Sequence, residues 1–280
     1  MKGSEFVQTY KKASLAKWEA AAVELARQGS TVQWPRVTLK LEADGHTATL
    51  KVASDYFAIG TPEDFVRLPL TPRTAQTIAN LSGELLPTPK LVSDIHKQSS
   101  VQLTPSPMGN RGANLEDYAA HSAKIETLRA SRVGLVSGVK KDVVISNLAK
   151  AGKVLIYGWF WPEGVKPGGG FSNPIQPRSN VHGDFYVDYS HGIRFVAPVM
   201  TVDGEDMMTE AVLRDPKLSK LVSDEGAVRQ VRYPADNAPA PYRPHTSAEY
   251  RASYDVYPVS RTVSLSDQGL GQLLAMAEKK

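Results

Sequence analysis

The chain has 280 residues, a hydrophobic fraction of 41%, a formal net charge of +4 and no cysteine. This length and hydrophobic fraction fit one large domain or two modest ones and exclude global disorder. The lack of cysteine excludes disulfides and thiolate chemistry, the scattered lysines and arginines do not predict a nucleic-acid partner, and no segment reaches the ~18–20 apolar residues of a membrane span.

Four residues near the start of the chain, Gly3-Ser4-Glu5-Phe6, are what two common adjacent cloning sites encode when they are read in frame. We therefore interpret residues 1–6 as vector-derived. Such a segment often replaces a signal peptide, so we expect a secreted or periplasmic bacterial protein. A chain without oxidisable thiols fits that location.

Residues 7–130 make up the first of two expected segments, which is mainly helical with one hairpin. Apolar spacing predicts a helix over residues 7–28. Asp44-Gly45, between two alternating runs, predicts a hairpin over residues 37–52. Three more helices are expected, over residues 73–81, 90–99 and 115–130, the first two because proline stands at the helix start.

Residues 131–280 make up the second segment, which is richer in strands. Lys153–Trp161 is apolar and aromatic and predicts a core strand. A glycine-containing loop follows over residues 162–177, and long loops of this kind are often functional. The remaining expected elements are a strand over 196–202, short helices over 207–213 and 217–222, a linker over 235–244 and a terminal helix over 268–277. The irregular order predicts an α+β fold with mostly antiparallel or mixed sheets and peripheral helices, as one domain or two lobes.

Reactive side chains are densest in residues 182–194, directly after the glycine loop. This stretch holds two histidines, two aspartates, two tyrosines, a serine and an arginine. Alternation predicts a strand over residues 184–190 with one polar face and one packing face. Polar groups this dense are costly to bury unless they pair or do chemistry.

Two residues of this stretch are the leading catalytic candidates. A turn at Ser190-His191-Gly192 would bring Asp188 against His191. The carboxylate would fix the imidazole tautomer and raise its basicity, as a general base requires. His182 and Tyr186 complete the catalytic candidates. The candidates for substrate binding are Arg194, Trp161, Tyr189 and Lys140.

A zinc ion is the competing use of the same side chains. His182, Asp188 and His191 could supply three ligands and leave the fourth position for water. Their spacing matches no zinc motif, so we expect no cofactor and keep zinc as the alternative. Ser137 and Lys140 have the Ser-x-x-Lys spacing of penicillin-recognising enzymes, but no Lys-Thr-Gly follows and we treat the match as coincidence.

These patterns favour an exported bacterial hydrolase or lyase that acts on a polymer, either cell-wall glycan or peptide or a polysaccharide. Tyr157, Trp159 and Trp161 alternate on one face of the expected core strand, where they would either fill a core or form a platform for sugar rings. The alternative function is a non-catalytic module that binds a glycan or a protein. A third possibility is a structural or cargo protein whose polar strand faces water.

Overall fold

A computed structural model describes residues 1–109, 112 and 114–235, and it confirms the expected α+β fold. The linker over 235–244, beyond its first residue, and the terminal helix over 268–277 lie outside the described residues. The helices are α1 (Gly3–Tyr10), α2 (Leu15–Arg27), α3 (Pro72–Ser82), α4 (Pro89–Gln98), α5 (Leu115–Arg129), α6 (Thr209–Arg214) and the 3-10 helix η1 (Leu218–Leu221). The strands are β1 (Arg36–Ala43), β2 (His46–Ala53), β3 (Ala58–Thr61), β4 (Asp64–Arg67), β5 (Val101–Gln102), β6 (Val136–Ser137), β7 (Lys141–Val143), β8 (Ile156–Gly158), β9 (Gln176–Ser179), β10 (His191–Gly192), β11 (Val196–Val202) and β12 (Glu205–Met208).

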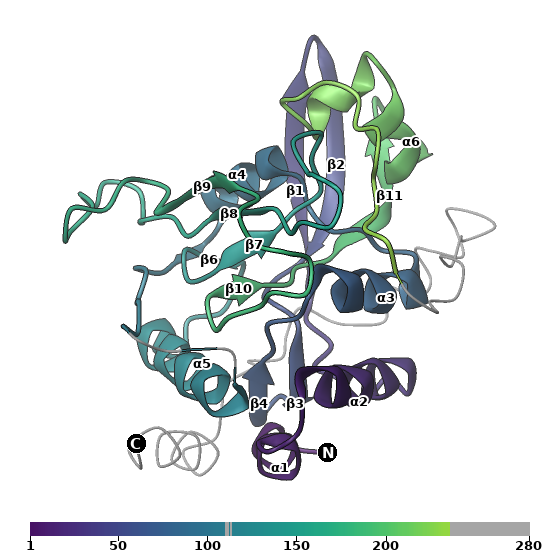
Figure 1. Cartoon of the computed structure of the whole chain (residues 1–280). Helices are drawn as coiled ribbons and strands as arrows, with labels where there is room; N and C mark the ends of the chain where they lie inside the picture. The colour runs from purple at the N-terminus through teal and green to yellow at the C-terminus, as the bar shows by residue number, and fades with distance from the viewer. Residues whose placement is uncertain (110–111, 113, 236–280) are drawn as a thin grey trace.

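One four-stranded antiparallel sheet has the order β1-β2-β11-β12. The β1–β2 hairpin projects from one end of the molecule (Figure 1). Its turn residues Asp44 and Gly45 have φ angles of 50° and 83°, the positive values that a tight hairpin turn requires. The expected hairpin is therefore confirmed. Its second strand, β2, pairs with β11.

A second four-stranded sheet, β10-β7-β8-β9, carries the candidate site. β10 runs parallel to β7 with His191 opposite Lys141, and β8 runs antiparallel to β7 with Tyr157 opposite Asp142. Two short ladders, β3–β4 and β5–β6, complete the strand pairing.

The two helices with proline at their start are confirmed. The Thr71 and Thr88 side chains accept hydrogen bonds from the backbone N–H groups of Thr74 and Leu91, at 3.4 and 3.1 Å. These bonds satisfy donors that the first helical turn leaves unpaired. Both helices consequently begin at the proline that follows the threonine.

The expected helix over residues 7–28 is divided into α1 and α2. Ser14 has extended backbone (φ −66°, ψ 157°) and forms the N-cap of α2. Serine favours this role because its side chain competes with helical hydrogen bonding. The sequence pattern missed the break because apolar spacing continues across it.

Residues 1–6 are part of the fold rather than an appendage. Phe6 is fully buried, and the Ser4 hydroxyl and backbone N–H donate to the Asp64 carboxylate at 2.6 and 2.9 Å. A Cβ at Gly3 would lie 2.6 Å from the Cα of Phe65. The vector-derived interpretation of this segment stays a prediction, as does the expectation of export that rested on it.

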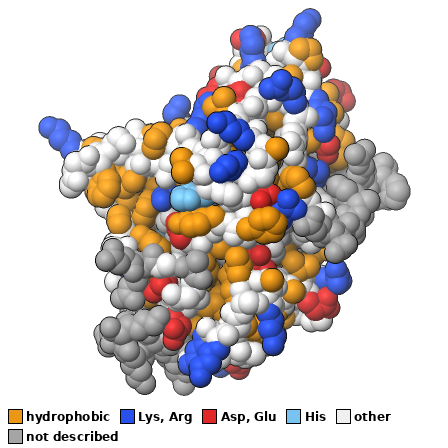
Figure 2. Space-filling model, in the orientation of Figure 1, with side chains coloured by type: hydrophobic (Ala, Val, Ile, Leu, Met, Phe, Trp, Pro, Cys, Tyr) orange, Lys and Arg blue, Asp and Glu red, His pale blue; other side chains and the backbone are white. Residues whose placement is uncertain are grey.

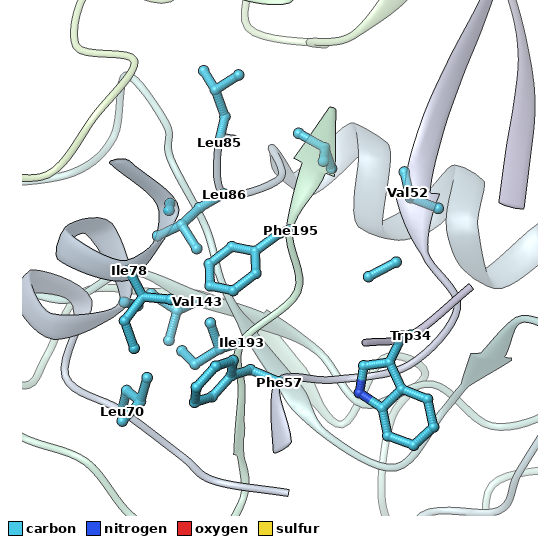
Figure 3. Packing of buried hydrophobic residues seen from close by; sticks show 14 of the residues in the cluster. Trp34, Val52, Phe57, Leu70, Ile78, Leu85, Leu86, Val143, Ile193 and Phe195 are labelled. Carbon is cyan, nitrogen blue, oxygen red and sulfur yellow. The ribbon is translucent and has the colours of Figure 1, made fainter. Parts of the chain in front are cut away.

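The hydrophobic core draws on both expected segments. β2 pairs with β11, and Val101 of β5 pairs with Val136 of β6, so strands pair across residue 130. Figure 3 shows Phe57 and Phe195 side by side within one cluster that also contains Val143. The packing gives no boundary at that position between two separate cores.

Charged side chains are also buried in the core. Arg67 donates to both carboxylate oxygens of Asp55, at 2.9 and 2.5 Å, and to Glu126 at 2.5 Å. Burial opposes charge on each group, but the two carboxylates outweigh it and raise the pKa of Arg67. This network fixes β4 to α5 and to the segment after β2.

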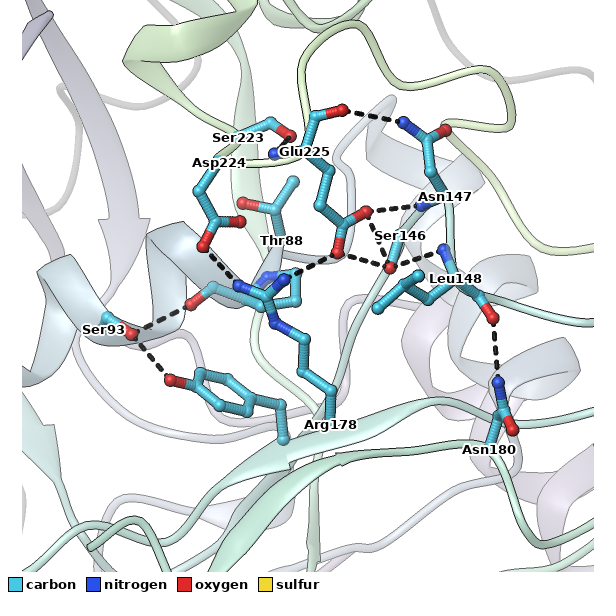
Figure 4. A network of polar contacts seen from close by, with 12 residues as sticks. Thr88, Ser93, Ser146, Asn147, Leu148, Arg178, Asn180, Ser223, Asp224 and Glu225 are labelled. Carbon is cyan, nitrogen blue, oxygen red and sulfur yellow. Dashed lines mark hydrogen bonds and ion pairs between the residues drawn. The ribbon is translucent and has the colours of Figure 1, made fainter.

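A network of hydrogen bonds and ion pairs joins Asp224 and Glu225 to β9 and to the segment after β7 (Figure 4). Glu225 accepts hydrogen bonds from the Ser146 hydroxyl at 2.7 and 2.8 Å, from the Asn147 N–H at 2.7 Å and from Arg178 at 3.1 Å. Arg178 also binds Asp224. Because Arg178 directly follows the glycine loop, this network anchors that loop at its C-terminal end.

The expected core strand over residues 153–161 is shorter than the sequence indicates. The strand β8 covers only Ile156–Gly158, Lys153 forms an isolated bridge with Gly183, and Gly158 and Trp159, with φ angles of 111° and 64°, turn the chain after β8. A tryptophan in the left-handed region is uncommon and strained. Tyr157, Trp159 and Trp161 therefore do not share one strand face. None of the helices in the described part combines the length and apolarity needed to cross a bilayer.

Candidate functional site

Residues 184–190 form two tight turns, so the expected strand is wrong. The Tyr186 N–H donates to the Gly183 carbonyl at 3.0 Å, and the His191 N–H donates to the Asp188 carbonyl at 3.1 Å. The expected packing face is lost as a result: Val187 is buried, whereas Phe185 is 68% exposed. Glycine and the local Asp–Ser bonds favour turns over pairing in this stretch.

Asp188 is the centre of the second turn. One carboxylate oxygen accepts from the Ser190 N–H at 2.8 Å and from the Ser190 hydroxyl at 2.5 Å. The other accepts from the Tyr186 hydroxyl at 2.9 Å. Burial raises the pKa of Asp188, but protonated His191 and the Ser190 bonds outweigh it and lower the pKa to about 2. Asp188 is therefore ionised at neutral pH.

His191 lies behind this turn, in β10, and is 1% exposed. Burial lowers its pKa to about 4, although Asp188 acts in the opposite direction, and Lys141 lowers it further. We expected Asp188 to make His191 more basic than usual. Asp188 does raise the pKa, but the loss of solvent dominates. The imidazole is consequently neutral at pH 7.

The ring nitrogens of His191 have no hydrogen-bond partner among the described residues. Buried polar atoms are nearly always paired, so an unpaired imidazole beside a carboxylate indicates a functional group rather than a structural one. Asp188 thus neighbours His191 electrostatically, and the backbone turn fixes their proximity.

His182 and Tyr186 form the outer layer of the site. Their rings are stacked with centroids 3.9 Å apart and an interplanar angle of 12°. The Tyr186 ring also meets that of His191 at 5.7 Å and 64°. Tyr186 is 37% exposed, so it connects the surface to the buried histidine. The structure thus brings all four catalytic candidates into one contact series.

Lys140 and Tyr189 lie beneath the turn and not at a solvent-facing surface. The Lys140 ammonium is 1% exposed and donates to the Tyr189 carbonyl at 2.5 Å. Burial, reinforced by Arg67, lowers the pKa of Lys140 to about 7. The Tyr189 hydroxyl accepts from the Met108 N–H at 3.0 Å. Their contacts position the turn and leave neither side chain directed at a ligand.

Three residues next to this layer also carry unpartnered polar atoms. They are the Tyr118 hydroxyl, both ring nitrogens of His121 and the indole nitrogen of Trp159, which are buried and have no hydrogen-bond partner in the described part of the chain. The His121 ring meets Tyr189 at 4.9 Å and Trp159 at 6.5 Å. Lys141 lies 5.3 Å from the centre of the Trp159 ring. The Tyr118 hydroxyl and the Trp159 indole can each donate a hydrogen bond, and the neutral His121 imidazole can donate one and accept one.

Arg194 is part of the core. Its guanidinium donates to the carbonyls of Ala53 and Val136 at 2.6 and 2.7 Å and lies over the Tyr56 ring at 4.3 Å. Its carboxylate neighbour is Asp142, at 3.9 Å. We predicted Arg194 as a substrate-binding residue, whereas these contacts join β2, β6 and β7. Burial raises the pKa of Asp142 to about 7 despite this neighbour.

Trp161 lines a separate cleft of about 590 Å³ with His96 and Phe160. The His96 ring stacks on Phe160 at 4.7 Å. Its Nε2 contacts the Trp161 carbonyl at 3.0 Å, and its Nδ1 contacts the Ser137 hydroxyl at 2.9 Å. The imidazole is fixed between α4 and β6 by these contacts. The glycine loop borders this cleft through residues 162–167.

The possible zinc ligands do not form a metal site in this arrangement. Among the described residues, no three His, Asp or Glu side chains are placed to hold a metal ion, including His182, Asp188 and His191.

Figure 2 shows basic, acidic and hydrophobic side chains interspersed over the coloured part of the face drawn.

Sequence reasoning missed the inner residues Tyr118, Trp159 and Lys141 as part of this neighbourhood. No local pattern could join them to Asp188, because the connection runs through β7–β10 pairing and through side-chain packing.

Comparison of the chain with protein-family models, with curated proteins and with solved structures found no match.

Proposed function

We propose that this protein is a hydrolase or lyase that acts on a polymer and uses His191 as its general base. The observation that carries the proposal is a neutral, buried imidazole with unpartnered ring nitrogens beside the ionised Asp188. The charge of Asp188 stabilises the imidazolium that forms when His191 takes a proton. A pKa near 4 keeps the base deprotonated throughout the neutral range.

Tyr186 is the second group with a chemical role in the proposal. Its hydroxyl donates to Asp188 at 2.9 Å, and burial together with that carboxylate raises its pKa to about 12. It therefore remains protonated and can give a proton to a leaving group, with His182 stacked behind it. This assignment makes Tyr186 the acid and His191 the base.

A polymeric substrate is favoured by the surface over this centre. Phe185 and Tyr186 are exposed, and His182 stacks on Tyr186. Flat rings at a surface pack against the faces of sugars or aromatic side chains. Cell-wall glycan or peptide and polysaccharide meet this requirement.

The proposed chemistry assigns no metal ion to the centre, and export to the periplasm or medium remains part of the proposal. The donor set of His182, Asp188 and His191 is not assembled as ligands. Elemental analysis of the purified protein tests this point. Stoichiometric zinc, with activity lost on chelation and restored by zinc, would replace the metal-free mechanism.

Turnover on purified cell walls and on a panel of neutral and acidic polysaccharides tests the proposal. We expect His191→Gln to abolish turnover while circular dichroism and thermal unfolding stay close to those of the unmodified protein. His46→Gln is the matched control, because His46 is a surface histidine paired with Asp203 at the distant hairpin. No turnover on any of these substrates, or full turnover by His191→Gln, would reject the enzyme.

The second candidate is a non-catalytic module that binds a glycan or a protein, and the Trp161 cleft favours it. Phe160 and Trp161 line this cleft, and stacked aromatics are typical of sugar recognition. If this is the function, Trp161→Ala will abolish binding to the polymer measured by pull-down, and His191→Gln will leave binding unchanged. Turnover would be absent from both variants and from the unmodified protein.

A further inference from the structure

A second cavity lies away from the proposed centre, between the C-terminal ends of α2 and α3. Its volume is about 590 Å³, within the range of small-molecule sites. Its apolar wall is formed by Trp34, Phe57, Ile78, Leu81 and Phe195. The cavity opens to solvent at its rim, where Arg27, Gly29 and Gln33 are exposed.

The wall residues belong to the core and keep only a small exposed area. Trp34, Phe57 and Phe195 are each 7% exposed, and Ile78 is 6% exposed. Phe57 and Phe195 meet edge to face at 6.0 Å, and Figure 3 shows Trp34 standing apart from this pair. Core contacts behind each ring hold the wall in place without a ligand.

The polar groups in the lining are already paired within the protein. Asp55 binds Arg67 through two hydrogen bonds, and Glu84 contacts Arg36 at 2.7 Å. The Trp34 indole N–H donates to the Tyr56 carbonyl at 2.6 Å. A charged ligand would therefore lose its hydration without gaining a partner of opposite charge.

We propose that this cavity binds one small, uncharged apolar molecule with a planar or branched body. Burial of the apolar surface of such a ligand against three aromatic rings supplies the binding free energy. The balanced Arg36–Glu84 pair at the lining selects against both anions and cations. The site is independent of His191 and Asp188, neither of which lines it.

Fluorescence titration with the neutral dye N-phenyl-1-naphthylamine tests the proposal on the full chain. We expect saturable binding of one dye per chain, and at least tenfold weaker binding of the anionic analogue 1-anilinonaphthalene-8-sulfonate. Leu81→Trp and Ile78→Trp should each weaken dye binding at least tenfold by filling the cavity. Leu81 is only half-buried, so its variant keeps the test valid if Ile78→Trp does not fold.

Trp161→Ala is the control, because it alters the other cleft and should leave dye binding unchanged. The proposal is overturned if the dye does not bind, if Leu81→Trp binds it normally, or if Trp161→Ala removes binding. Saturation at one dye per two chains would overturn it in favour of an interface between copies. Turnover on polymers is read separately, so failure of this site and failure of the enzyme are distinguishable.

Discussion

Asp188 and His191 are held near each other by a single turn, in which the backbone N–H of His191 donates to the Asp188 carbonyl at 3.1 Å. Ser190 fixes the carboxylate from within the same turn. The result is an ionised acid next to a neutral base, with Tyr186 between the pair and solvent. This relationship is what the proposed chemistry depends on.

Replacing Asp188 by asparagine should lower turnover on the active polymer by at least about 100-fold, since the charge that stabilises the His191 imidazolium would be lost. The pKa of His191 should fall further, because Asp188 is the group that raises it. Histidine titration by NMR measures the second effect. Asp203→Asn is the control, since Asp203 pairs with the distant His46. Turnover within threefold of the unmodified protein would contradict the role of Asp188.

The pH dependence of activity should follow His191. Because burial lowers its pKa to about 4, the base loses its proton as pH rises through that value. Turnover should therefore rise between about pH 3 and 5 and stay level to pH 7. A rise centred near 6.5 would show instead that an ordinary, solvated histidine is the base. Rates from pH 3 to 8, with folding monitored at each pH, measure this.

Lys140→Met should increase stability below pH 7 and flatten its dependence on pH. The folded protein lowers the Lys140 pKa from 10.5 to about 7, so it binds fewer protons than the unfolded chain between these values. Stability of the unmodified protein should rise with pH across that window. At pH 6 the free energy of unfolding of the variant should be higher by a few kcal/mol, reduced by the loss of the hydrogen bond to the Tyr189 carbonyl. Urea unfolding at pH 6 and 10 measures this difference, with Lys12→Met as the control because Lys12 is exposed. If Lys140→Met and the unmodified protein depend equally on pH, the prediction is contradicted.

Arg67→Met should destabilise the fold by about 3–5 kcal/mol, because Asp55 and Glu126 would be left buried and unpaired. Arg27→Met, which removes an exposed ion pair with Glu24, should cost no more than about 1 kcal/mol. Urea unfolding of the two variants gives the comparison. Similar losses for both would show that the buried network does not stabilise the fold.

Removal of residues 1–6 should lower the melting temperature, because Phe6 is buried and Ser4 binds Asp64. Phe6→Ala alone should cost about 3–5 kcal/mol. Glu5→Gln is the matched control, since Glu5 is exposed and its bond is local. Unchanged stability of the shortened chain would show the segment to be dispensable, as the vector-derived interpretation implies.

Local signals in the sequence predicted much of the fold. Asp44-Gly45 specified the hairpin because its turn needs positive φ, and Thr71-Pro72 specified the start of α3 because proline fits a first helical turn. The mixture of helices and antiparallel strands followed from such local patterns. They failed where the backbone leaves regular structure while the apolar pattern continues, as at Ser14 and at Trp159.

Which reactive groups lie close together along the chain could be read from the sequence alone. A turn at Ser190 was enough to predict that Asp188 lies near His191, because the two residues are close in the sequence. Their protonation depends on the tertiary fold, since burial lowers the pKa of His191 against the influence of Asp188. The tertiary fold also decided that Lys140 and Arg194 face the core. Burial depends on contacts between residues far apart in the chain, and no local pattern encodes it.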